Sequence, residues 1–242
     1  MQGSIAAIIC AAGSSSRMGG VKKEYLLLPE PGFLSEKPLT VLGAALSAFA
    51  SSPRIGPIVI TVPPDSENAV RDSLPPELCS GKRIFFVNGG PSRRASVFNA
   101  LSFLITYAPS HVLIHDGARP WIKPELVEKI IDAVITFKAV IPALPLIETP
   151  KELKRKEAGT PQDEPDFIGR HLKRADICTA QTPQGFRFPE ILKAHEKAAE
   201  REEVEYTDDA EVWGEFIGEV AVIPGDPENR KITYPEDIRG AT

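Results

Sequence analysis

Small and cationic residues follow the first apolar run of the chain, in the stretch "IICAAGSSSRMGGVKKEYLLL" (residues 8–28). Small residues let backbone N–H groups approach an anion closely, and serine hydroxyls add donors. Arg17 supplies positive charge as a planar fork and Lys23 as a mobile point charge. The composition predicts a phosphate cradle, with a merely flexible connection as an equal alternative. The small residues of this loop are Ala11, Ala12, Gly13, Ser14, Ser15 and Ser16.

The loop is not one of the two common nucleotide-binding motifs. It lacks the Gly-Lys-Ser/Thr ending of a Walker loop, and it does not match the GxGxxG pattern that follows the first strand of dinucleotide-binding domains. A dinucleotide-dependent dehydrogenase is therefore poorly supported.

Two later stretches place similar chemistry after further apolar runs. In "NGGPSRRASVFNAL", Gly90 and Ser96 lie between a predicted strand and a predicted helix. Their hydrogen-bond donors can face an anion, or the stretch can be an ordinary turn with a capping serine. In "VLIHDGARPWI", Asp116 and Arg119 follow a strand, where a carboxylate can hold Mg²⁺ and a guanidinium can bind phosphate. The alternative is a local Asp116–Arg119 ion pair beside a buried, hydrogen-bonded His115.

The remaining polar stretches are ambiguous by themselves. In "TAQTPQGF", Thr182 can be a turn former, and in "YTDDAEV" the commoner role of Asp208 and Asp209 is to cap a helix. Lys231, in "ENRKITYPED", would ordinarily be a solvated charge.

Apolar runs without polar alternation predict the frame that positions these loops. Such runs fit strands buried on both faces of a parallel sheet, and right-handed crossovers bring the loops after them to one edge. The predicted strands are 5–10, 58–62, 84–87, 111–115, 139–141 and 219–223. Helical patterns lie between or after them, at 39–50, 66–74, 96–107, 124–137 and 190–203. This alternation predicts an α/β layered domain.

Composition excludes several classes of function. With 242 residues, a net charge of −5 and 42% hydrophobic residues, the chain can bury a core but has no excess positive charge for a broad nucleic-acid or membrane surface. Any anion binding is therefore local. We found no signal peptide and no membrane-spanning apolar run, and three widely spaced cysteines form no zinc pattern, so we expect a cytoplasmic protein with reduced thiols.

The segment from Glu148 to Ala175 differs from the rest of the chain, because charged and turn residues crowd it. It fits either a disordered linker or an excursion such as a hairpin arm, and composition alone favours the linker slightly.

Together, and in this order, these stretches resemble the cytidylyltransferases that act on 2-C-methyl-D-erythritol 4-phosphate in the non-mevalonate isoprenoid pathway. The family's AAGxGxRM and following PKQ correspond to "AAGSSSRM" and "KKEY", its GGxxRxxSV to "GGPSRRASV", and its HDAARP to "HDGARP". Its later TPQ, TDD/E-A and NIKIT-PED elements correspond to residues 181–184, residues 207–210 and "NRKITYPED". The resemblance covers almost the whole chain.

The resemblance implies one nucleotidyltransferase domain over residues 1–242, with a doubly wound, mostly parallel sheet of Rossmann-like type. It implies a protruding β-arm at about residues 146–176, which exchanges between the subunits of a homodimer and so reverses the preference for a linker. The implied reaction joins CTP to the polyol phosphate, releases pyrophosphate and uses Mg²⁺.

The resemblance also implies roles for individual residues. Arg17 and Lys23 are implied to stabilise charge on the α-phosphate of CTP, and Asp116 to hold the metal and contact the substrate. The implied nucleotide contacts are small residues of two loops: Ala11, Ala12, Gly13, Ser14, Ser15, Gly90 and Ser96. The implied contacts to methylerythritol phosphate are Arg119, Thr149, Arg174, Thr182 and Lys231. Arg174 and Lys231 also count among the catalytic cations, and Thr149 and Arg174 are implied to come from the partner's arm.

Several positions depart from the family pattern. Ser15 replaces a loop glycine, Lys22 the usual proline and Glu24 the usual glutamine, and the position of Tyr25 favours Lys23 over Lys22 as the lysine that faces phosphate. Two further departures lie later in the chain: Pro91, where some members have an acidic residue, and Arg230, which interrupts NIKIT.

Two rival functions stay open at this point. A cytidylyltransferase for ribitol 5-phosphate shares the loop and the metal chemistry, and arm residues would distinguish it. A non-catalytic nucleotide-binding protein of the same fold would be expected to lack Arg17, Lys23 or Asp116, all of which are present.

Overall fold

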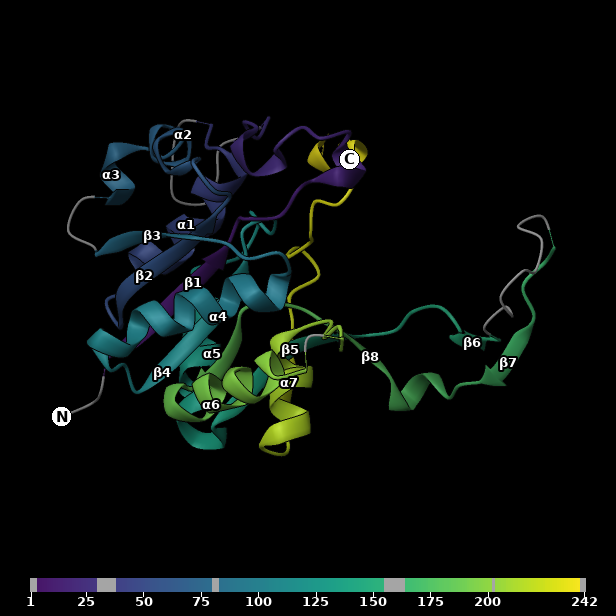
Figure 1. The fold of residues 1–242 in the computed structure, drawn as a ribbon. Coiled ribbons are helices and arrows are strands. Elements are labelled where there is room, and N and C mark those ends of the chain that lie inside the picture. The colour runs from purple at the N-terminus through teal and green to yellow at the C-terminus, as the bar shows by residue number, and fades with distance from the viewer. Residues whose placement is uncertain (1–3, 30–37, 80–82, 155–163, 202, 240–242) are drawn as a thin grey trace.

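The computed structural model describes residues 4–29, 38–79, 83–154, 164–201 and 203–239. A twisted sheet with the strand order β10-β5-β9-β4-β1-β2-β3 runs through the body, with β8 paired to β5 (Figure 1). Its strands are β1 (Ile5–Cys10), β2 (Ile55–Val62), β3 (Ile84–Asn88), β4 (His111–Asp116), β5 (Ala139–Pro145), β8 (Cys178–Ala180), β9 (Gln184–Arg187) and β10 (Ala221–Pro224).

The central strands are parallel, which confirms the predicted fold class. β1 pairs in parallel with β2 and β4, β2 with β3, and β5 with β10. β9 is antiparallel to both β4 and β5, and β8 is antiparallel to β5. The sheet is therefore mixed but mostly parallel. The sequence prediction missed β8 and β9, which are short and lack a continuous run of β-branched residues.

Helices cover both faces of the sheet, as the side chains of β1 show by pointing alternately to one face and the other. Ile5, Ala7 and Ile9 pack with α1 and α5 on one face, whereas Ala6 and Ile8 pack with α4, α6 and α7 on the other. The helices are α1 (Val41–Ser51), α2 (Glu67–Asp72), α3 (Pro76–Cys79), α4 (Arg93–Leu104), α5 (Pro124–Phe137), α6 (Phe188–Ala199) and α7 (Asp209–Phe216). Among the described residues, no helix is long and apolar enough to cross a membrane.

Side chains define where the helices begin. The Thr40 hydroxyl accepts a hydrogen bond from the Gly43 N–H at 3.0 Å and caps α1, and Pro124 begins α5, where its missing N–H costs no hydrogen bond. Helix α4 begins at Arg93 with Ser92 as its cap, so the expectation that Ser96 opens this helix was wrong by three residues.

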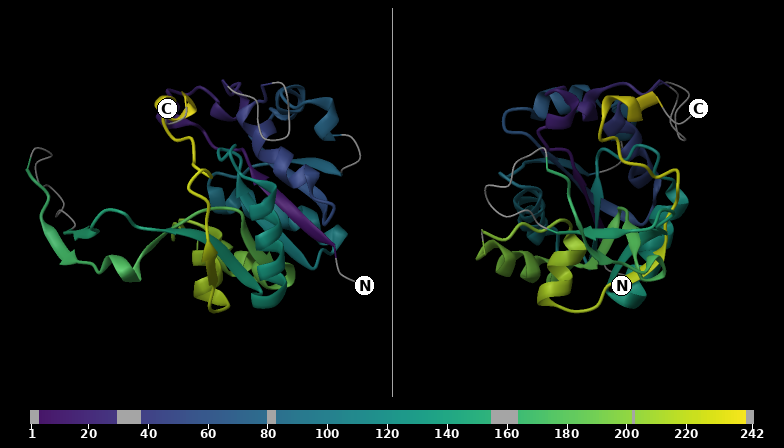
Figure 2. Two further views of the ribbon diagram at one scale, coloured as in Figure 1. Left: turned by 180° about the vertical axis from the view of Figure 1, so that it is seen from behind. Right: turned by 90° about the vertical axis from the view of Figure 1, so that its right-hand side faces the viewer.

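A two-stranded antiparallel hairpin extends away from the body. It consists of β6 (Lys151–Leu153) and β7 (Ile168–His171), and two views show it standing clear of the helices (Figures 1 and 2). The described parts of this segment are thus a hairpin arm, as the resemblance implies, rather than the linker that composition favoured. Several large apolar side chains on the arm are exposed, namely Ile147, Leu153, Phe167 and Ile168.

Candidate active site

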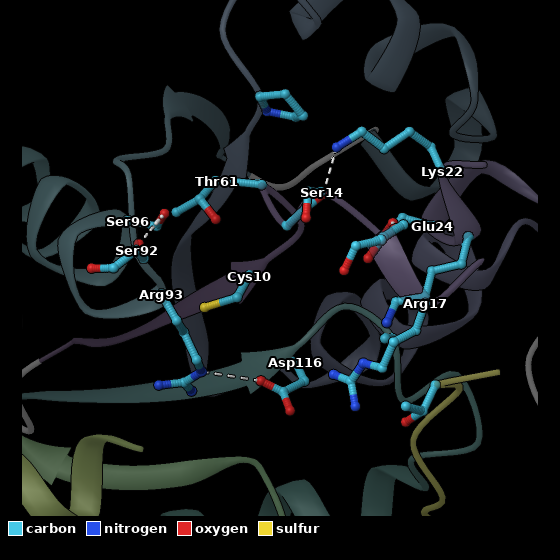
Figure 3. Close-up of a pocket in the computed structure, with 18 of the residues that line it drawn as sticks. Cys10, Ser14, Arg17, Lys22, Glu24, Thr61, Ser92, Arg93, Ser96 and Asp116 are labelled. Atoms are coloured by element: carbon cyan, nitrogen blue, oxygen red, sulfur yellow. Dashed lines mark hydrogen bonds and ion pairs between the residues drawn. The ribbon is translucent and has the colours of Figure 1, made fainter. Parts of the chain in front are cut away.

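A cavity of about 630 Å³ lies at the edge of the sheet where β1, β2, β3 and β4 end (Figure 3). The parallel pairing of these strands carries their following loops to this one edge, where α/β domains bind ligands. Ten of the predicted site residues line the cavity: Ala12, Gly13, Ser14, Ser15, Arg17, Lys23, Gly90, Ser96, Asp116 and Lys231. The structure therefore brings most of the predicted site residues together at one cavity, including the cations Arg17, Lys23 and Lys231.

The phosphate loop, residues 11–16, is anchored where it leaves the sheet. The backbone N–H of Ala11 donates to the carbonyl oxygen of Thr61 at 3.1 Å, so Ala11 itself is buried behind the cavity rather than part of its wall. Ser15 adopts a left-handed conformation with φ 52°, a region that favours glycine. Ser14, the residue before it, is exposed to solvent. Serine thus stands at the position where glycine would be least strained.

The second loop, which contributes Gly90 and Ser96 to the cavity wall, is held together by its own hydrogen bonds. The hydroxyl of Ser96 accepts a hydrogen bond from the Gly90 N–H at 3.0 Å and donates to the carbonyl oxygen of Ser92 at 2.9 Å. A Cβ atom at Gly90 would lie 2.5 Å from the Cβ of Ala95, so only glycine allows this close approach of the loop to α4.

Three cationic side chains surround the Asp116 carboxylate in the cavity wall. Its carboxylate lies 2.9 Å from Nζ of Lys231, 3.4 Å from Nε of Arg93 and 3.7 Å from Nε of Arg119. Although burial raises the pKa of Asp116, these three cations hold it well below its usual range. The carboxylate is therefore ionised and positions three cations at once.

The structure separates the two adjacent lysines. Lys23 is 9% exposed and lines the cavity, and its pKa is lowered by burial and by the nearby charges of Lys231 and Arg17. Lys22 also lines the cavity, but its Nζ donates to the carbonyl oxygen of Gly13 at 2.5 Å. Both lysines thus lie at the cavity, and the choice of Lys23 as the lysine that faces phosphate stays a prediction.

Thr182 lies behind Asp116 and does not belong to the cavity wall. Its hydroxyl accepts from the Asp116 N–H at 3.1 Å and donates to Nδ1 of His115 at 2.9 Å. Nε2 of His115 then carries the proton and donates to the carbonyl oxygen of Arg119 at 3.3 Å. Burial lowers the pKa of His115 to about 4. This chain of hydrogen bonds fixes the backbone that presents Asp116.

Arg93 is a cavity residue that the sequence analysis did not select. In Figure 3 its guanidinium points from α4 toward Asp116. Its Nη1 lies 2.8 Å from Oδ2 of Asp209, whose other oxygen contacts Nε2 of His195 at 3.2 Å. Asp208, not Asp209, caps α7 by accepting from the Glu211 N–H. Arg93 stands at the arginine of the family pattern GGxxRxxSV, and this match was the signal available for its role.

Two predicted substrate contacts lie on the arm and not at this chain's cavity. Thr149 and Arg174 are both exposed, and Nη1 of Arg174 donates to the carbonyl oxygen of Ile147 at 2.6 Å. A single chain therefore does not bring them to the cavity, and their roles stay predictions that depend on a second subunit.

The cavity offers a partial metal site. Among the described residues, no group of three or more His, Cys, Asp or Glu side chains is arranged to hold a metal ion. Asp116 is an ionised carboxylate at the cavity, and Glu24 is a second carboxylate in its lining, which suits Mg²⁺ that takes most of its ligands from triphosphate oxygens and water. The residues present thus fit a metal that arrives with the nucleotide.

The chain is similar to known proteins in both sequence and structure. Residues 5–242 match the family described as "IspD: 2-C-methyl-D-erythritol 4-phosphate cytidylyltransferase". The chain is 36% identical over 237 residues to the bifunctional enzyme IspD/IspF of Brucella abortus, covering 96% of this chain and 55% of that protein. It is 34% identical over 245 residues to the bifunctional enzyme of Bartonella bacilliformis, covering 98% and 56%. The chain spans about half the length of the curated relatives it matches.

Two solved structures match this chain over almost their whole length. The 4-diphosphocytidyl-2C-methyl-D-erythritol synthase of Anaerococcus prevotii superposes with a TM-score of 0.76 at 28% identity, covering 98% of this chain and 96% of that chain. The 2-C-methyl-D-erythritol 4-phosphate cytidylyltransferase of Thermus thermophilus superposes with a TM-score of 0.69 at 29% identity and the same coverage. Because nearly all of its residues match this family, the chain belongs to the IspD family of 2-C-methyl-D-erythritol 4-phosphate cytidylyltransferases.

Proposed function

We propose that this protein transfers the cytidylyl group of CTP to 2-C-methyl-D-erythritol 4-phosphate and releases pyrophosphate. The observation that carries the proposal is the cavity in which Arg17, Lys23, Arg93 and Lys231 gather beside the small-residue loop and Asp116. Membership of the IspD family, and the activity for which the structurally similar proteins are named, support CTP and methylerythritol phosphate as the substrates.

The cavity suits a reaction between two polyanions. A phosphate oxygen of the polyol attacks the α-phosphorus of CTP, a new P–O bond forms, and the bond to the β-phosphate oxygen breaks as pyrophosphate leaves. The attacking phosphate is already anionic, so no general base is needed. Fixed cations such as Lys23 and Arg17 lower the barrier by holding both anions and neutralising the charge that develops.

The carboxylate of Asp116 is the group that would hold Mg²⁺ at this site. When bound, the ion neutralises charge on the triphosphate and on the leaving pyrophosphate. Asp116 also positions Lys231 and Arg93, which line the same cavity, a role that belongs to the chain itself.

The proposal includes a homodimer in which each arm completes the partner's cavity. The exposure of Ile147 and Phe167 on the arm supports it, because large apolar side chains gathered on a slender extension favour contact with another protein surface. We further propose a cytoplasmic location, where CTP is available.

Pyrophosphate release measured with CTP, Mg²⁺ and each polyol phosphate in turn tests the proposal. We expect release with methylerythritol phosphate and little with ribitol 5-phosphate. Release with ribitol phosphate alone would assign the rival substrate, and binding of CTP without any release would favour a non-catalytic protein.

A further inference from the structure

The segment Lys22–Glu24 reaches back to the phosphate loop at two points. Nζ of Lys22 donates to the carbonyl oxygen of Gly13 at 2.5 Å, and the hydroxyl of Ser15 donates to Oε2 of Glu24 at 3.2 Å. Each contact joins residues nine positions apart in the sequence. Figure 3 shows Lys22 stretched toward the loop beside Ser14, with Glu24 on the same side of the cavity.

The loop conformation depends on support of this kind. Ser15 lies in the left-handed region with φ 52° and ψ 36°, which residues with a side chain adopt only where their surroundings hold them. Its partner Glu24 is only 3% exposed, so the carboxylate is fixed by the surrounding chain rather than free in solvent. A fixed acceptor can therefore hold Ser15 in its strained conformation.

The second contact acts on the other end of the same turn. Gly13 is exposed and has nothing within 4 Å of the place where a Cβ would be, so side-chain packing does not hold it. The ammonium of Lys22 gives its carbonyl oxygen a charge-assisted hydrogen bond instead. The two contacts thus flank Ser14.

We propose that Lys22 and Glu24 are positioning residues that hold residues 13–15 ready to receive the triphosphate, an inference that rests on the proposed function for the identity of the ligand. A loop that is competent only part of the time binds its ligand more weakly in proportion to that fraction. Holding it in advance lowers the ordering cost of binding.

Two substitutions of Glu24 separate the hydrogen bond from the charge. Glu24→Gln and Glu24→Ala both remove the negative charge, but only the glutamine keeps an oxygen that accepts from Ser15. We expect calorimetry with CTP and Mg²⁺, without polyol phosphate, to give a Kd about fivefold higher for the alanine variant than for the glutamine variant. At saturating CTP, kcat should differ less than about twofold between them, because the contact orders the loop before binding.

A double-mutant cycle checks that Ser15 is the partner. In a Ser15→Ala background, the difference between Glu24→Gln and Glu24→Ala should vanish, since the donor is gone. A difference that persists at its full size would overturn the assigned contact.

Hydrogen–deuterium exchange of the loop peptide provides a readout that does not need a substrate. Without nucleotide, Glu24→Ala and Lys22→Met should raise exchange at residues 13–15, whereas Glu24→Gln and Lys22→Arg, which keep an acceptor and a donor, should not. If all four variants exchange like the wild type while the wild type still releases pyrophosphate, the positioning role fails and the proposed function stands. If exchange responds as expected but the wild type neither binds nor turns over CTP, the proposed function fails instead.

Discussion

Arg93 and Asp209 form an ion pair, 2.8 Å from Nη1 to Oδ2, between the cavity wall and the helical layer behind it. The Asp209 side chain is 1% exposed and also contacts His195. Although burial raises the pKa of Asp209, Arg93 and His195 lower it overall, so the carboxylate is ionised. Arg93 is thus held from behind while its Nε faces Asp116.

Replacing Asp209 with asparagine should destabilise the protein, because it leaves the partly buried charge of Arg93 with less compensation. We expect the free energy of unfolding in urea to fall by about 2–3 kcal/mol. Asp132→Asn provides a matched control, since it breaks an Arg–Asp pair of 2.6 Å whose aspartate is exposed, and should cost less than about 1 kcal/mol. Equal losses in the free energy of unfolding would show that the Arg93–Asp209 pair stabilises the protein no more than the exposed control pair does.

The two adjacent lysines should respond differently to alanine. Lys23→Ala removes a cation at the cavity and should lower kcat by about 10²–10³-fold, by analogy with the loss of one transition-state donor. Lys22→Ala should mainly raise the KM for CTP, because it releases the Gly13 carbonyl. Steady-state pyrophosphate release at varied CTP distinguishes these outcomes, and similar losses of kcat would mean that the catalytic lysine is misassigned.

His115 should make stability depend on pH between about 6.5 and about 4. Its pKa is lowered from 6.5 to about 4 in the folded protein, so over this range the unfolded chain binds the extra proton and the folded protein does not. Stability therefore falls as the pH falls through this window, by about 3 kcal/mol in total.

The measurement for His115 is a difference between two proteins. Urea unfolding of the wild type and of His115→Gln at several pH values isolates this histidine from carboxylates that titrate lower, such as Asp116. The variant should be less stable at pH 7 but show a flatter slope above pH 4. Parallel slopes would contradict a neutral buried His115.

Mixed dimers test whether the arm acts on the partner's cavity. Lys23→Ala and Arg174→Ala are each expected to lose most activity. If Arg174 serves the other subunit, a mixed dimer of these two variants has one intact site of two. Statistical mixing then makes half the dimers mixed and restores about a quarter of the wild-type rate. Activity that stays at the level of the single variants would place Arg174 outside the partner's site.

The chain order of the motifs predicted the cavity well, because parallel strands bring successive loops to one edge whatever the side chains between them. Contacts between distant segments could not be predicted in this way. Arg93 owes its position to Asp209, which belongs to a different helix, and Thr182, predicted as a substrate contact, supports the backbone of Asp116. Similarly, Ser15 and Glu24 are both departures from the family pattern, and only the structure shows that they touch.

The three cations around Asp116 affect which anions the cavity can bind. Arg93, Arg119 and Lys231 already share a carboxylate of the chain itself, so an incoming anion must compete with an internal rival that is always present at high effective concentration. A lone carboxylate or a monoanion gains little from such an exchange. A triphosphate, with several charges at fixed spacing, can engage Lys23 and Arg17 as well. Polyanions can therefore displace the Asp116 carboxylate from its cations, whereas monoanions cannot.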